Sequence, residues 1–282
     1  MSATKTGMLP VPGADLYYEI RGAGPLLLVG QSGEGDAGRS VDLVDGLVDR
    51  YTVVTYDRRG LSRSTIDDQA RPLTIGTHAD DVHHLLAELT DEPALILGCS
   101  LGAIIGLHLA VKHPEQVGTL IAHEPVALRL LPDAERESAD RKLGDIQEIH
   151  HREGWLPAIK KVAEVLGIDP SAQDVEPGLT PHPITADRGP NFEFFLEEDL
   201  NAVRGDTLGG AEIAALRGGP TRIVPAAGRT TPRDVFDYRC AQVLAELLGD
   251  VEPVGFPGGH NGNLTHPRAF AARVREVLDG SV

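Results

Sequence analysis

The chain has 282 residues, of which 41% are hydrophobic, and carries a formal net charge of −16. This length is enough for one large α/β domain with an insertion or for two small domains. The negative charge argues against nucleic acid and anionic membrane surfaces as partners. No apolar run approaches the roughly 18 residues of a membrane span.

The N-terminal residues lack the apolar core of a signal peptide, so we expect a cytoplasmic protein. Cys99 and Cys240 are the only cysteines, and we expect no disulfide between them because one directly precedes Ser100 and the other falls in a predicted helix. No Cys/His cluster has zinc-like spacing, and no G-x-G-x-x-G or P-loop is present. We therefore expect no metal and no cofactor, and the chain is compatible with a monomer or a homodimer.

Strands and helices alternate over the first 125 residues. Apolar runs predict strands at 16–20, 25–29, 51–56, 94–97 and 119–122. Helical patterns separate them at 41–48, 78–89 and 101–112. This alternation favours a parallel sheet with right-handed crossovers.

The alternation stops after Pro125. Residues 130–205 are charged and helix-like, with Pro- and Gly-rich interruptions, and the alternation returns with a strand at 221–226 and a helix at 235–248. A strand at 252–256 and a helix at 267–278 end the chain. We therefore predict one α/β core formed by residues 1–125 and 213–282, with a helical cap inserted at 126–212.

The most informative stretch is Gly98-Cys99-Ser100-Leu101-Gly102, between an apolar strand and an apolar helix. In this order, G-x-S-x-G places the serine hydroxyl on a sharp strand-to-helix turn. The unpaired N–H groups at the start of the helix stabilise developing negative charge. We therefore predict that Ser100 is a nucleophile, with an idle serine in a glycine-rich turn as the alternative.

A serine nucleophile needs a base and an acid. His260 follows the last predicted strand in a glycine-containing loop, which makes it the candidate base among the 11 histidines. The loop after the strand at 221–226 has Thr230 and Thr231 where an acid is usual, and Asp234 more plausibly caps the next helix. Glu124, at the end of the strand after Ser100, is the preferred acid; Asp234 or no acid at all are the alternatives.

An oxyanion hole requires two N–H donors. Leu101, directly after the nucleophile, is one candidate, and Ser32, in the loop after the strand at 25–29, is the other, with Gln31 next. Residues 57–64, Asp-Arg-Arg-Gly-Leu-Ser-Arg-Ser, resemble a nucleotide-site motif. Ion pairs that hold this loop to its neighbours are the simpler explanation.

Four motifs carry a resemblance to a known group. They are Gly-Cys-Ser-x-Gly-Ala from residue 98, His-Glu at 123–124, Ala-Ala…Thr-Pro at 226–232 and Pro-Gly-x-His…His-Pro at 257–267. The whole chain resembles the α/β-hydrolase fold superfamily, and these motifs are similar to those of the zearalenone lactone hydrolases. The resemblance implies a mostly parallel central sheet flanked by helices, with the cap after the sixth strand. It also implies a Ser100–His260–Glu124 triad that cleaves an ester or lactone without a cofactor.

In that group a tryptophan of the cap packs on a macrocyclic substrate. Phenylalanines stand near the corresponding place here, and the candidate substrate contacts are Gln31, Trp155, Phe192, Phe194 and Phe195. The expected substrate is a small hydrophobic ester or lactone. The alternatives are a general esterase, a cofactor-free oxygenase or C–C hydrolase, and a non-catalytic ligand receptor.

Overall fold

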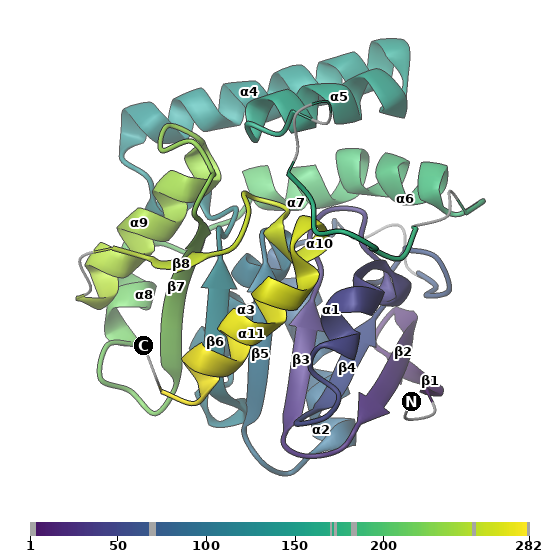
Figure 1. Cartoon of the computed structure of the whole chain (residues 1–282). Coiled ribbons are helices and arrows are strands. Elements are labelled where there is room, and N and C mark those ends of the chain that lie inside the picture. The colour runs from purple at the N-terminus through teal and green to yellow at the C-terminus, as the bar shows by residue number, and fades with distance from the viewer. Residues whose placement is uncertain are drawn as a thin grey trace.

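The computed structural model describes residues 4–67, 72–169, 171, 174–181, 185–249 and 252–280. Among these residues, eight strands form one sheet in the order β1-β2-β4-β3-β5-β6-β7-β8 (Figure 1). The strands are β1 (Lys5–Val11), β2 (Ala14–Gly22), β3 (Leu26–Gly30), β4 (Thr52–Tyr56), β5 (Ala94–Cys99), β6 (Val117–His123), β7 (Arg222–Gly228) and β8 (Val254–Phe256).

The strands from β3 to β8 pair in parallel, as the alternating pattern predicts. β1 and β2 pair antiparallel with each other, and β2 pairs antiparallel with β4. The sequence did not predict β1, because it is a largely exposed edge strand that contains Pro10 and has no continuous apolar run. The Pro12-Gly13 turn, with φ of 79° at Gly13, permits only the antiparallel hairpin.

Helices cover both faces of the sheet (Figure 1). One face carries α1 (Val41–Asp45) and α11 (Pro267–Leu278), and the other carries α2 (Ile75–Leu89), α3 (Leu101–Lys112), α8 (Gly210–Ala215) and α9 (Phe236–Leu248). The short elements between them are η1 (Ala37–Ser40), η2 (Pro114–Gln116) and α10 (Gly262–Thr265). This is the predicted α/β architecture, with a parallel sheet between two helical layers.

The helix predicted over 41–48 is shorter than expected. It ends at Asp45, where Gly46 forms the C-cap, and the chain continues in turns, with the N–H of Leu47 donating to the Val44 carbonyl three residues earlier. Gly46 packs closely on α11, since an added Cβ atom would lie 2.7 Å from Ala271. The cysteines are as predicted: Cys99 and Cys240 are free and buried.

The connection between β6 and β7 contains the remaining helices, and we call residues 124–221 the inserted segment. Its elements are η3 (Leu128–Leu130), α4 (Asp133–Glu153), α5 (Trp155–Val165), α6 (Arg188–Phe194), the π-helical turn η4 (Phe195–Asp199), α7 (Leu200–Arg204) and α8. In Figure 1, α4 to α7 lie across the carboxyl ends of the parallel strands. This is the edge of the sheet at which Ser100, Glu124 and His260 follow their strands.

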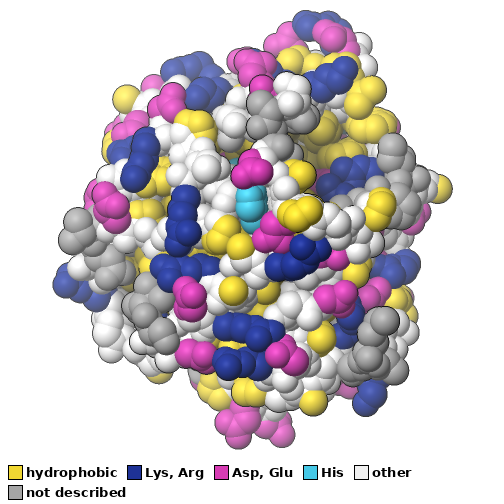
Figure 2. All heavy atoms as spheres, in the orientation of Figure 1, with side chains coloured by type: hydrophobic (Ala, Val, Ile, Leu, Met, Phe, Trp, Pro, Cys, Tyr) yellow, Lys and Arg dark blue, Asp and Glu magenta, His cyan; other side chains and the backbone are white. Residues whose placement is uncertain are grey.

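Figure 2 shows positive and negative side chains interspersed over the face that carries α11. The negative net charge is therefore not gathered into a single acidic patch on that face. None of the helices in the described ranges is long and apolar enough to cross a membrane.

Candidate functional site

Ser100 lies on a sharp turn between β5 and α3. Its backbone has φ of 51° and ψ of −109°, and its N–H donates to the carbonyl oxygen of His123 at 2.9 Å. A side chain other than glycine costs about 1–3 kcal/mol in such a conformation. The flanking glycines permit the turn, because an added Cβ at Gly98 would lie 2.7 Å from Ala103 Cα and one at Gly102 would overlap the Gly30 carbonyl. The predicted strand–turn–helix is therefore present.

Glu124 follows β6 and is also in a strained backbone conformation, with φ of 45°. Its N–H donates to the carbonyl oxygen of Ala226 at 2.9 Å, and its Oε1 accepts from the N–H of Gly228 at 2.8 Å. Its Oε2 accepts from Nδ1 of His260 at 2.7 Å. The carboxylate is fully buried, so both of its oxygens are held in fixed directions.

His260 follows β8 in a loop that is joined to the loop after β7. The N–H of Arg229 donates to the Phe256 carbonyl at 2.9 Å, and the N–H of Thr230 donates to the Gly258 carbonyl at 3.1 Å. The two loops approach so closely that a Cβ added at Gly228 would lie 2.5 Å from the carbonyl carbon of Gly259. This contact brings His260 beside Glu124.

Asp234 is exposed, and the structure does not bring it to His260. The expectation that it caps the following helix is wrong, because Val235 occupies the N-cap position of α9 and Asp234 lies one residue too early.

Glu124 and His260 each stabilise the charged form of the other. Burial raises the pKa of Glu124, but the hydrogen bond and the charge of His260 outweigh it and hold that pKa at about 2. Burial lowers the pKa of His260, whereas the hydrogen bond to Glu124 and the charges of Asp237 and Glu124 raise it above its ordinary value. Glu124 is therefore ionised at neutral pH, and Nδ1 of His260 carries the proton that it shares with Glu124.

The loop after β3 contains Gln31 and Ser32 and lies against the start of α3. Gly30, which ends β3, pairs in register with Gly98, two residues before Ser100. Arg58 anchors this loop, since its guanidinium donates hydrogen bonds to the carbonyl oxygens of Gln31 and Gly33. The Gln31 side chain is buried and accepts from Ser40 Oγ at 2.9 Å. Gln31 thus fixes the loop internally.

The expected ion pairs of residues 57–64 are present. Asp57 binds Arg63 with an Nε–Oδ2 distance of 2.8 Å, Arg59 binds Asp81, and Arg58 binds Asp199 of the inserted segment at 2.8 Å. The explanation of this motif as structural is therefore confirmed.

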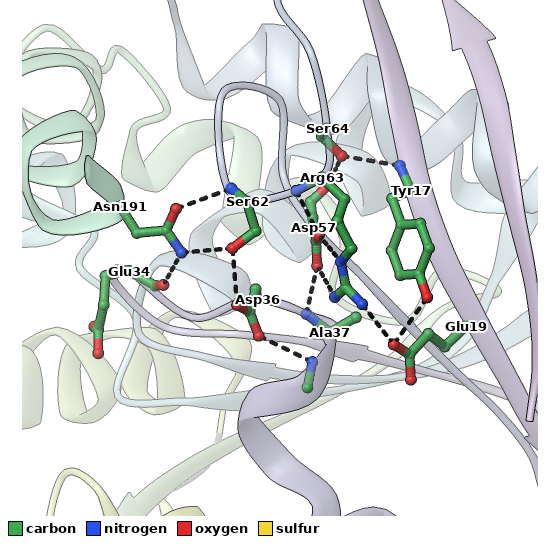
Figure 3. Close-up of polar contacts among 11 residues, drawn as sticks. Tyr17, Glu19, Glu34, Asp36, Ala37, Asp57, Ser62, Arg63, Ser64 and Asn191 are labelled. Carbon is green, nitrogen blue, oxygen red and sulfur yellow. Dashed lines mark hydrogen bonds and ion pairs between the residues drawn. The ribbon is translucent and has the colours of Figure 1, made fainter. Parts of the chain in front are cut away.

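The inserted segment is also fastened at Asn191 of α6 (Figure 3). The Asn191 side chain accepts from the Ser62 N–H at 2.9 Å and donates to Ser62 Oγ at 2.8 Å. Ser62 Oγ in turn donates to Asp36 at 2.8 Å. These contacts tie α6 to the loops after β3 and β4.

A small apolar cavity of about 40 Å³ lies beside Ser100. Ser100 and Asp237 are the polar side chains among its described lining residues, which are Ser100, Leu101, Val126, Leu143, Ile146, Val162, Val165, Leu166, Phe195, Leu200, Val203, Phe236 and Asp237. His260 lines a separate hollow that shares Leu166 with this cavity. Among the described residues no hydrogen bond reaches Ser100 Oγ.

The aromatic candidates of the inserted segment lie in different places. Phe195 lines the cavity beside Ser100. Trp155 stacks on Phe192, with ring centroids 5.2 Å apart, and Phe194 packs over Gly60. The cavity lining in the described part of the chain does not include Gln31, Trp155, Phe192 or Phe194.

The comparisons with known proteins agree with this architecture. The family model described as the alpha/beta hydrolase fold matches residues 25–146. A relative from Bacillus subtilis (strain 168), named "Uncharacterized hydrolase YraK", is 38% identical over 277 residues, which cover 97% of this chain and 96% of the relative. The chain belongs to the α/β hydrolase family.

Two more similarities cover nearly the whole of this α/β hydrolase. A protein of Caulobacter sp. (strain K31), named "Putative carbamate hydrolase RutD", is 27% identical over 94% of this chain and 96% of its own length. The structure of a thermophilic esterase from Thermogutta terrifontis covers 99% of this chain and 98% of its own, with a TM-score of 0.70 and 19% identity. The structural likeness supports the fold alone.

Sequence reasoning missed one residue of this α/β hydrolase's site. Asp237, in the first turn of α9, is buried, and its Oδ2 lies 3.8 Å from His260 Nδ1. The sequence feature that could have identified it is its position as a second carboxylate, three residues after Asp234 and at the start of a predicted helix. Within the described ranges, no group of three or more His, Cys, Asp or Glu side chains is placed to hold a metal ion.

Proposed function

We propose that this α/β hydrolase is a cofactor-independent serine hydrolase that cleaves a carboxylic ester or lactone. The observation that carries the proposal is the buried pair of Glu124 and His260, joined at 2.7 Å, at the same sheet edge as the strained turn of Ser100. A base oriented by a carboxylate beside a serine on such a turn is the arrangement that nucleophilic acyl transfer requires.

In this proposal His260 Nε2 takes the proton of Ser100 Oγ as that oxygen attacks the substrate carbonyl carbon. The ionised Glu124 keeps the proton on Nδ1 and stabilises the imidazolium that forms. The same proton then passes to the leaving alkoxide, which leaves an acyl group on Ser100. A water molecule gives a proton to His260 as it attacks the acyl carbon. The bond from that carbon to Ser100 Oγ then breaks, His260 returns the proton to Oγ, and the carboxylic acid leaves. The hydrogen bond from Ser100 to His260 would form in the substrate complex, since such bonds are often long in free enzymes.

The proposed oxyanion donors are the N–H groups of Leu101 and Ser32. Leu101 is the first residue of α3, where the helix offers its N–H no acceptor of its own. The loop of Ser32 is fixed by Arg58, which binds the carbonyl oxygens of the residues on either side of it, Gln31 and Gly33. Two donors fixed before the reaction stabilise the charge that develops on the carbonyl oxygen.

The cavity beside Ser100 indicates which substrates to test first. It is apolar but only about 40 Å³, so a short acyl group fits with less movement of α4 and α5 than a larger one. We propose that helices α4 to α7, within the predicted cap at 126–212, form a cap over this cavity. A zearalenone-type macrolactone would require that cap to shift, which favours the general-esterase alternative as the first substrate class.

The test is a substrate panel measured with the protein and with Ser100→Ala. The panel contains aryl acetates and butyrates, small lactones, zearalenone and an aryl carbamate, the last because of the relative named for carbamate hydrolysis. We expect short esters to be cleaved and Ser100→Ala to lower kcat by at least about 10³-fold. Cleavage that survives in Ser100→Ala would show that Ser100 is not the nucleophile. No turnover of any substrate would favour the oxygenase or C–C hydrolase alternative or the ligand receptor.

A further inference from the structure

Asp237 is a buried carboxylate beside His260 that the mechanism above leaves unused. It is 1% exposed, and its Oδ1 has no hydrogen-bond partner among the described residues. Its Oδ2 lies 3.8 Å from His260 Nδ1, the same nitrogen that binds Glu124. The side chain also lines the apolar cavity beside Ser100. A buried polar atom without a partner costs free energy, and such a cost persists more readily where the group has a function.

We propose that Asp237 is a positioning residue of this site, whose carboxylate adds a second negative charge beside His260 Nδ1 and stabilises the protonated imidazole. Glu124 supplies the hydrogen bond that fixes the ring, and Asp237 supplies charge without a hydrogen bond, because 3.8 Å is too long for one. Its role in hydrolysis rests on the proposed function, whereas its effect on His260 does not.

The groups that face Asp237 determine when this charge is present. Burial and the charge of Glu124 raise the pKa of Asp237 to about 7, although His260 lowers it. Cys240, one turn further along α9, keeps its proton because burial and Asp237 raise its pKa. His123, which directly precedes Glu124, is neutral because burial lowers its pKa to about 4. The imidazole of His260 and the carboxyl of Asp237 lie 3.8 Å apart, so the titration of each depends on the charge of the other.

The direct test is an NMR titration of the His260 imidazole in the full chain, in the wild type, Asp237→Asn and Asp234→Asn. An opposite charge within about 4–6 Å moves a pKa by about 1–3 units, so Asp237→Asn should lower the pKa of His260 by at least about 1 unit. Asp234→Asn removes an exposed carboxylate from the same stretch and should change nothing. An unchanged His260 pKa in Asp237→Asn would overturn the proposal.

A second readout uses the best substrate of the panel. In the pH dependence of kcat/KM, the limb that reports His260 should move to lower pH in Asp237→Asn by the same amount as the pKa of His260. The kcat should fall about tenfold for each pKa unit. A merely structural Asp237 would lower thermal stability and leave the profile in place. If no substrate turns over but the NMR shift is present, the proposed function fails and the role of Asp237 beside His260 stands.

Should Asp237→Asn fail to fold, the wild type decides. With ¹³C-labelled aspartate, one carboxyl signal should show an inflection at the midpoint of the His260 ring titration, because the two groups lie 3.8 Å apart. Aspartate signals of which none shifts at that midpoint would contradict the proposal.

Discussion

Arg58 should be among the most stabilising charged side chains of this protein. Its side chain is 2% exposed, that of its partner Asp199 is 0% exposed, and the same guanidinium binds two carbonyl oxygens of the loop after β3. In Arg58→Met, Asp199 would keep only His78, whose Nε2 lies 2.9 Å from Oδ1. Breaking a buried pair on one side costs about 3–5 kcal/mol. Since the hydrogen bond from His78 to Asp199 remains, we expect a loss at the lower end of this range, about 3 kcal/mol.

The assay is urea unfolding, and the free energy of unfolding is compared between each variant and the wild type. Arg50→Met is the matched control, because Arg50 and Asp279 form an ion pair whose side chains are 52% and 50% exposed. This variant should lose less than about 1 kcal/mol of unfolding free energy. Arg58→Lys, which keeps the charge without the fork of donors, should fall between the two. A loss in Arg58→Met as small as that in Arg50→Met would refute the reasoning.

The remaining predictions concern the turn and the buried carboxylate. Gly102→Ala should destabilise the protein by about 1–3 kcal/mol, because the added Cβ atom would overlap the Gly30 carbonyl. Gly144→Ala, in the middle of α4, should stabilise it by about 0.5–1 kcal/mol in the same unfolding assay, because the atom nearest to the added Cβ is 3.5 Å away. Ser100→Gly should be about 0.5–2 kcal/mol more stable than Ser100→Ala, because glycine relieves the strain of φ 51° but loses more chain entropy on folding; equal stabilities would argue against strain at this turn. The folded-state pKa of Asp237, about 7, lies above its ordinary value of 3.8, so the stability it contributes is complete below pH 4 and lost as the pH rises to 7. Asp237→Asn should therefore gain stability relative to the wild type between pH 4 and 7 in pH-dependent unfolding, and a constant difference would contradict the raised pKa.

Much of the fold was predictable because buried parallel strands are continuous apolar runs separated by helical patterns. The strand, turn and helix around Ser100 follow from local sequence, since the glycines at 98 and 102 are required by close backbone contacts. The pairing of Glu124 with His260 was predicted from where their strands end, and the structure places them 2.7 Å apart.

Other features depend on contacts distant in sequence, which no local pattern shows. The edge strand β1 has no apolar run, so only its pairing with β2 defines it. The proximity of Asp237 to His260 could not be predicted, because it depends on the packing of α9 against the loop of His260. The bond from Arg58 to Asp199 spans 141 positions, and the size of the cavity depends on how α4 and α5 pack over Ser100.

The most direct test of the central claim is labelling with a fluorophosphonate, which reacts with activated serine nucleophiles. The full chain would be treated at pH 8, and the adduct would be located by intact mass and peptide mapping. The account predicts one adduct, on Ser100, that is absent in Ser100→Ala and formed far more slowly in His260→Ala. No adduct in the folded protein, or an adduct on another residue, would contradict the claim that Ser100 is the nucleophile.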